Sequence, residues 1–237
     1  MKQFRGWLAT GVVALTAGLV TQPAQAATFF FNNTPYQSIA DIPAGFYAGG
    51  APTLLEDFED GTLDASLQAS VSGGVLISGF IIGTRSGAFV GLQDSVDGDD
   101  GAVDGARTTG NNAFSGAGSA GISFRFTGQT LPTAFGIVWT DGGGAVTFSA
   151  TAGDGSSLGS ITRSGFADTS VSGSVLEDRF FGVTSADGIR SIFISNSSGG
   201  IEVDHVQYGT MAPIPLPAAG WLMLTGLAGL FARRRRG

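Results

Sequence analysis

The sequence contains no cysteine and only one histidine, His205, among its 237 residues. Disulfide bonds, thiolate metal sites and cysteine nucleophiles are therefore excluded, as is any metal centre or mechanism that needs two histidines. Charged residues are also scarce, at 13%. Because 43% of the residues are hydrophobic, this low charge does not indicate a disordered chain. Glycine is abundant instead, with 39 residues, but it follows no G-X-Y period, which excludes collagen.

The first segment, residues 1–26, has the pattern of a secretory signal peptide. Lys2 and Arg5 give it a positive start, and an apolar run extends from Leu8 to Val20. The run ends at Ala24-Gln25-Ala26, a small-x-small cleavage site, so we expect removal after Ala26. The alternative, a membrane anchor, is disfavoured because the run is short and ends at a cleavage motif.

The last segment, residues 211–237, has three parts in a fixed order. A proline motif contains Pro215 and Pro217, and an apolar stretch then runs from Ala218 to Ala232. The stretch is slightly shorter than the ~20 residues that usually span a bilayer. It is followed by a basic cluster of Arg233, Arg234, Arg235 and Arg236. By the positive-inside rule these arginines would stay in the cytoplasm, with the body of the protein outside.

This order of proline motif, short helix and arginine cluster resembles the PEP-CTERM sorting signal of Gram-negative bacteria, in its VPLPA-type variant. The matching motif here is Ile-Pro-Leu-Pro-Ala, from Ile214 to Ala218. The resemblance implies that an exosortase-type enzyme cuts near the prolines. It further implies a protein that is exported, held briefly in the inner membrane, and then released or re-anchored at the cell surface. The alternative is a plain C-terminal anchor.

Removal of both ends changes the charge of the body. Six of the 12 basic residues lie in the two end segments, whereas all 19 acids lie between Asp41 and Asp204. The six arginines that remain give the body a formal charge of −13. Such a body repels nucleic acid and anionic lipid and attracts cations, so nucleic-acid binding is excluded.

The body shows the pattern of one all-β domain, a single jelly-roll-like β-sandwich over residues 54–210. Apolar residues alternate with polar ones in short runs, which is typical of strands. The runs are Ile122–Phe126, Val146–Ala150, Ile192–Ser195 and Ile201–Tyr208, with a more continuously apolar, central strand at Ala134–Trp139. Turns are predicted at 141–144, 154–157, 187–188 and 197–200, and residues 27–53 are expected to be a leader that covers an edge or stays mobile. About eight to ten strands at this spacing favour a sandwich or barrel.

Several segments of the body are similar to recurring segments of a bacterial family of PEP-CTERM-tailed secreted proteins. They include residues 54–64, 94–105, 135–144, 177–183 and 199–209. This resemblance implies export and implies no established activity.

Acids are concentrated where the body begins and ends. On a strand, alternation would place Asp57 and Glu59 on one face, and Glu202 and Asp204 on one face. The first and last strands of a sandwich are often neighbours, so the two pairs would repel unless a cation lay between them. Oxygen ligands in this number suit Ca²⁺. The alternative is that these acids are solvated charges on a sheet edge.

A second acidic segment extends from Asp94 to Asp104 and fits neither the EF-hand nor the nonapeptide calcium motif. Asp97, Asp99 and Asp104 are candidate ligands of an irregular Ca²⁺ loop. The alternative is a solvated acidic loop.

Residues for catalysis are few. Nothing like Gly-x-Ser-x-Gly precedes a helix, and a lone strand histidine such as His205 usually has a structural role. The segment from Glu202 to Gln207 is faintly similar to the E-x-D-x-x-E signature of laminarinase-type hydrolases, but Gln207 cannot act as the acid/base. Trp139 and the 18 phenylalanines are expected to fill the core.

We therefore expect an exported, non-enzymatic cell-surface or matrix protein, stabilised by structural Ca²⁺ and associated with exopolysaccharide or biofilm. The alternatives are a carbohydrate-binding module and, less favoured, a glycan-active hydrolase or lyase.

Overall fold

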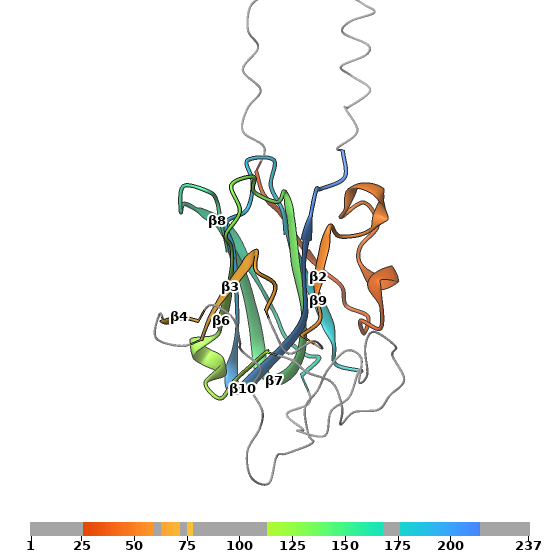
Figure 1. The fold of residues 1–237 in the computed structure, drawn as a ribbon. Helices are drawn as coiled ribbons and strands as arrows, with labels where there is room; N and C mark the ends of the chain where they lie inside the picture. The colour runs from red at the N-terminus through yellow and green to blue at the C-terminus, as the bar shows by residue number, and fades with distance from the viewer. Residues whose placement is uncertain (1–25, 59–62, 72–74, 78–112, 168–175, 214–237) are drawn as a thin grey trace, which may run out of the picture.

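The computed structural model describes residues 26–58, 63–71, 75–77, 113–167 and 176–213, and these residues confirm the all-β class (Figure 1). Their helices are 3-10 turns only: η1 (Ile39–Asp41), η2 (Ala48–Gly50) and η4 (Gly118–Ala120). The strands are β1 (Thr28–Phe31), β2 (Leu54–Glu56), β3 (Leu67–Val71), β4 (Val75–Ile77), β5 (Ala113–Ser115), β6 (Ile122–Phe126), β7 (Ala134–Thr151), β8 (Ser157–Arg163), β9 (Arg179–Thr184) and β10 (Ser191–Gly209).

The described strands belong to one antiparallel sheet with two very long strands in the middle. Its order is β1-β9-β7-β10-β6-β3-β4, while β8 pairs with β7, and both β2 and β5 pair with β10. The first part of β7 pairs with β9 and its last part with β8. Likewise the first part of β10 pairs with β6, and its last part with β5 and β2. Strands β7 and β10 therefore each contribute to two halves of the sheet. The first half contains β1, β9, β2, β5, the first part of β7 and the last part of β10. The second half contains β8, β6, β3, β4, the last part of β7 and the first part of β10.

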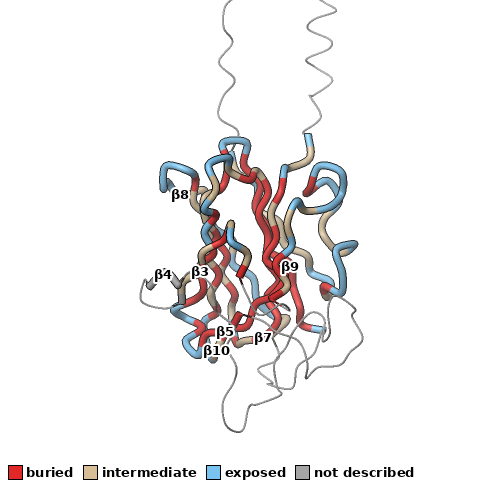
Figure 2. Tube along the Cα trace, viewed as in Figure 1, coloured by how far each residue is buried: buried red, intermediate tan, exposed pale blue. Residues whose placement is uncertain are grey.

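The two halves fold over one another and enclose the main core, which gives the sandwich-like arrangement (Figures 1 and 2). Phe148 in the second half lies 5.9 Å, between ring centroids, from Phe181 in the first half. Phe29 of β1 contacts the same Phe148 ring at 6.0 Å. The prediction that Trp139 and many phenylalanines fill the core is confirmed, since Trp139 is fully buried there.

The fold line between the halves is built from glycine and one buried asparagine. Pairing between β7 and β10 changes register between Asn196 and Ser198, and again between Ser198 and Ile201. Opposite them, Gly142 has φ 153°, and a Cβ there would lie 2.9 Å from the Asn196 side chain. The Asn196 Nδ2 donates to the carbonyl oxygens of Gly143 (3.3 Å), Gly200 (2.9 Å) and Ser198. This side chain thus joins the two bent strand segments.

Two of the predicted turns are wrong for this reason. Residues 141–144 lie inside β7 and residues 197–200 inside β10, where Ser198 pairs with Gly143 and Ile201 with Gly142. Glycine permits the bend while cross-strand pairing continues, so the chain does not reverse direction. The turns at 154–157 and 187–188 are confirmed between β7 and β8 and between β9 and β10, and Ala134–Trp139 is central, between β9 and β10.

Residues 27–53 add strand β1 to the sheet and cover the outer face of its first half. A second cluster forms there from Tyr36, Phe46 and Tyr47 of this segment, packed on Ala134, Val138 and Phe180. These sheet residues alternate along their strands with those that face the main core. The first half is therefore buried on both of its faces.

Candidate functional site

Strand β2 lies beside the last part of β10, so the segments that open and close the body are neighbours. Glu56 pairs with Val206, and Tyr208 with Leu54. The strand ends at Glu56, however, and Phe58 is a buried residue with φ 63°. Asp57 therefore follows the strand instead of lying in it, and strand alternation does not apply to Asp57. Glu59 lies outside the described residues.

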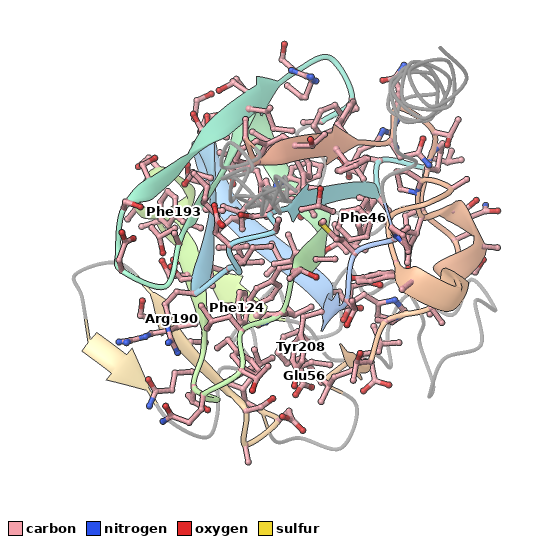
Figure 3. All side chains as sticks on the ribbon, turned by 90° about the horizontal axis from the view of Figure 1, so that it is seen from above. Phe46, Glu56, Phe124, Arg190, Phe193 and Tyr208 are labelled. Carbon is pink, nitrogen blue, oxygen red and sulfur yellow. The ribbon has the colours of Figure 1, made fainter. Side chains whose placement is uncertain are left out.

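The carboxylate of Glu56, which the sequence analysis did not select, organises this junction (Figure 3). It is 6% exposed and accepts hydrogen bonds from the backbone N–H groups of Phe58, at 2.8 Å, and Asp64. These bonds draw the two ends of segment 57–63 together. In the sequence Glu56 is one of four acids between residues 56 and 60, and nothing in the composition of the segment distinguishes it.

Glu202 and Asp204 are buried, with exposed fractions of 1% and 0%. The alternative that they are solvated edge charges is therefore wrong for these two residues. Strand pairing places Glu202 opposite Asp141, which is itself only 6% exposed. Like charges directly opposite one another destabilise a sheet unless surrounding groups compensate. This pairing brings two buried carboxyl groups together near the fold line.

The backbone is irregular directly after Asp204. The register between β10 and β7 shifts between Asp204 and Gln207, and His205 has φ 45°. The Asp204 Oδ1 accepts a hydrogen bond from the His205 backbone N–H at 2.6 Å. The His205 ring stands edge-on to Tyr36, with 5.6 Å between centroids, and its Nδ1 lies 3.3 Å from the tyrosine hydroxyl. This geometry buries the imidazole between the sheet and segment 27–53.

Gln207 occupies the third position of the hydrolase-like pattern and is fully buried. Its Nε2 donates to the His205 carbonyl oxygen at 3.3 Å. Its Oε1 is buried and has no hydrogen-bond partner among the described residues. An amide cannot exchange a proton as a carboxyl group does, so Gln207 offers no acid/base function beside Glu202 and Asp204.

Arg179 directly follows a second acidic pair, Glu177 and Asp178, in the sequence. Its guanidinium donates to the carbonyl oxygens of Leu176 (2.9 Å) and Asp178 (2.8 Å) and lies 5.3 Å from the centre of the Phe166 ring. Burial lowers the pKa of Arg179, while the negative charges of Asp178 and Glu177 act in the opposite direction. The positive charge is thus held inside the sandwich, beside Trp139 on the paired strand.

The described residues do not assemble a metal centre by themselves. Among them, no three histidine, aspartate or glutamate side chains are grouped so that they could hold a metal ion. The predicted ligands Asp57, Glu202 and Asp204 therefore do not form a complete set. The other predicted ligands, Glu59, Asp97, Asp99 and Asp104, lie outside the described residues.

No aromatic platform of tryptophan or tyrosine forms on the surface of the described residues. The sequence has three tyrosines, and Tyr36 and Tyr47 are 0% and 3% exposed. Tyr208 is half-buried, and its hydroxyl is 2.7 Å from the Ser66 Oγ. Trp139, the one tryptophan between the two end segments, is fully buried.

The residues predicted to direct sorting lie at or beyond the ends of the described fold. Ala26 is exposed and comes two residues before β1. Pro215, Pro217 and the four arginines, Arg233, Arg234, Arg235 and Arg236, lie outside the described residues. Within the part of the chain that the structure describes, no helix is both long and apolar enough to cross a membrane.

The chain matches no protein-family model and no curated protein.

Proposed function

We propose that this chain is an exported, non-enzymatic protein of the cell surface or extracellular matrix, processed at both ends. Its body is the sandwich, of jelly-roll-like class. Its N-terminal segment acts as a cleaved signal peptide, and its C-terminal segment as a PEP-CTERM-like sorting signal recognised by an exosortase-type enzyme. Before processing, the C-terminal helix would hold the protein in the inner membrane.

The observation that best supports this proposal is that both ends leave the fold side by side. Thr28 pairs with Thr184, Thr184 with Ala134, and Ala134 with Gly209, so the four residues form one row across the sheet. Three strand spacings of ~4.8 Å separate the first and last members of the row by about 14 Å. Both ends of the described chain leave at the top of the molecule in Figure 1. Two apolar end segments attached there would enter the same membrane surface.

In the sequence, both proposed processing points are also adjacent to described residues of the fold. Ala27 is half-buried against the main core, one residue after the expected cleavage. At the other end, Thr210 accepts a hydrogen bond from the Ala48 N–H (2.8 Å), and the Ala212 N–H donates to Phe46 (3.3 Å). A cut beyond Pro213 would therefore leave every described hydrogen bond of the body in place.

Structural Ca²⁺ remains part of the proposal in a narrower form. Because no three candidate side chains gather among the described residues, a site with three or more carboxylates must include at least one residue outside them. Glu59, Asp97, Asp99 and Asp104 are the predicted candidates for that role. If the site exists, EDTA should lower the melting temperature and millimolar Ca²⁺ should restore it by mass action. An identical melting temperature with EDTA and with Ca²⁺ would remove Ca²⁺ from the proposal.

Of the two alternatives, a carbohydrate-binding module that depends on exposed tryptophan or tyrosine has little support, because Trp139, Tyr36 and Tyr47 are buried. A hydrolase of the laminarinase type has little support either, because the third position of its signature is the buried amide Gln207. Association with envelope or matrix polysaccharide does not depend on either arrangement and is retained.

Cell fractionation tests the proposal. The full chain is expressed in a Gram-negative host with an exosortase, beside variants in which Pro215 and Pro217 become alanine or in which the four arginines become serine. The native chain should reach the cell surface or medium in a shortened form, whereas the variants should remain uncut in the inner membrane. A matched control, Pro132→Ala in the body, should be processed normally unless it unfolds. Native protein that stays in the cytoplasm at full length would refute the proposal.

A further inference from the structure

The outer face of the second half of the sheet differs from that of the first half, because no described segment covers it. Its residues alternate with core residues: in β6, for example, Ile122, Phe124 and Phe126 are buried while Ser123 is half-buried and Arg125 exposed. The middle row of outward residues crosses five strands. In order from β8 to β3 it consists of Ser160, Ser149, Phe193, Ser123 and Ser70.

The rows on either side have the same chemistry. Toward the fold line the row is Thr162, Thr147 and Ser195. On the other side of the middle row, away from the fold line, the row is Thr151, Ser191, Arg125 and Gln68. We call these three rows the hydroxyl face, since nine of their twelve members are serine or threonine.

The hydroxyls of this face are held in place by their neighbours across the strands. Thr147 and Thr162 bond through their Oγ1 atoms at 3.0 Å, and Thr151 Oγ1 bonds to Ser191 Oγ at 2.6 Å. Each hydroxyl can donate once and accept twice, so a pair bonded in this way still has hydrogen-bonding capacity toward a ligand. The middle row spans four strand spacings, about 19 Å.

Phe193 provides the one aromatic ring of the hydroxyl face. It is half-buried, and its Cε2 and Cζ atoms would lie 2.5 Å from a Cβ at position 121, where the chain has glycine. The ring therefore leans across Gly121, the residue directly before strand β6. In Figure 3 Phe193 lies on the side of the molecule away from Phe46, which belongs to the segment that covers the first half.

The charge of the face decides which polymer it suits. The body carries a formal charge of −13, yet none of the described aspartates or glutamates lies in the three rows. Arg125 is the single ionised group of the face, too little positive charge to hold a nucleic acid. A strongly anionic polymer would be repelled by the body as a whole. An uncharged polymer can approach without desolvating a carboxylate.

We propose that the hydroxyl face binds an uncharged polysaccharide. Sugar hydroxyls would exchange hydrogen bonds with the serine and threonine hydroxyls, and an apolar face of a sugar ring would stack on Phe193. This inference rests on the proposed function, because an extracellular matrix is where such polymers are met. It adds the chemical class of the polymer and the surface that holds it.

Affinity electrophoresis of the full chain, recovered from cells, tests the inference. Native gels contain hydroxyethyl cellulose, dextran or laminarin as uncharged probes, or polygalacturonate as a charged one. At least one uncharged probe should retard the protein, and polygalacturonate should retard it less. Phe193→Ala and Ser149→Glu should each weaken the retardation about tenfold, the loss typical of a central contact. Ser164→Glu, which adds the same charge at an exposed residue outside the face, should have no effect.

The outcomes separate the two proposals. Equal retardation of native protein, Phe193→Ala and Ser149→Glu would overturn the binding face, and so would no retardation by any uncharged probe. A dimer that is abolished by Ser149→Glu would assign the face to a second copy of the chain instead. Melting curves show whether a variant is folded, and Ser123→Glu replaces any variant that is not. If the cell retains the protein in the cytoplasm, the proposed function fails, whereas the gel result still decides the binding face.

Discussion

Removal of the Asn196 side chain should destabilise the whole sandwich, because this one amide joins the bent segments of β7 and β10. Its two N–H groups can satisfy two of the three carbonyl oxygens within reach, those of Gly143, Ser198 and Gly200. Each net hydrogen bond contributes about 1 kcal/mol, and carbonyls left buried without a partner add to the loss. Asn196→Ala should therefore lower the free energy of unfolding by about 2–3 kcal/mol, or the melting temperature by about 5–10 °C.

The free energy of unfolding is measured in urea, with far-ultraviolet circular dichroism as the signal. Its dependence on urea concentration should be the same in the variant as in the native protein. Asn32→Ala is the matched control. The Asn32 side chain also makes three hydrogen bonds, donating to the Asp41 carbonyl oxygen (2.7 Å) and accepting from the N–H (3.2 Å) and hydroxyl (2.8 Å) of Thr34, but it does so at a half-buried surface position where water can replace them. This control variant should cost no more than about 1 kcal/mol. Asn196→Asp keeps the shape but directs an acceptor at carbonyl oxygens, so at neutral pH it should cost more than the alanine variant. Equal stabilities of the Asn196 and Asn32 alanine variants would refute the reasoning.

Three further predictions follow from single contacts. Tyr47→Phe should raise stability by about 1 kcal/mol in chemical denaturation, because the Tyr47 hydroxyl is buried without a hydrogen-bond partner among the described residues. Burial first, and the charge of Tyr36 second, raise the pKa of Tyr47, so the unfolded chain ionises before the folded one. Native protein should therefore lose stability as the pH rises above about 10, and the phenylalanine variant should lose less; the same alkaline slope in both would count against this assignment. Gly121→Ala should cost about 2–3 kcal/mol in thermal unfolding, since the residue has φ 68° and a Cβ there would lie 2.5 Å from the Ile194 carbonyl oxygen; an unchanged melting curve would contradict the packing described. Glu56→Gln should cost about 1–2 kcal/mol, because an amide can accept only one of the two backbone hydrogen bonds that the carboxylate accepts, and a smaller effect than that of Gln68→Glu on the surface would be evidence against this role.

The alternating segments predicted the strands well because alternation records burial directly. Ile122–Phe126 is strand β6 without a change of bounds, and its apolar residues face the core. Runs of glycine and serine predict turns because these residues often occur where a chain reverses direction. In β7 and β10 the same residues bend a continuous strand pair, and only the partner strand determines which of the two outcomes occurs.

The acidic residues were the harder part of the site to predict. Alternation along β10 does place Glu202 and Asp204 within one strand, but it cannot show that both are buried in the folded protein, with Glu202 opposite Asp141 of β7. It also missed Glu56, whose role comes from a positive φ two residues later and from the return of the chain at Asp64. Such contacts depend on tertiary structure and have no local pattern.

The sharing of β7 and β10 between both halves has a consequence for the order in which the chain can fold. Strand β10, which ends at Gly209, is the last element of the body to be synthesised, and both halves need it to complete their pairing. Pairing between segments so distant in sequence is slow to form, because loop entropy is lost before the contacts are gained. Neither half can therefore complete its pairing before β10 has been made. A chain exported as proposed would still be unfolded enough to be threaded through a secretion channel.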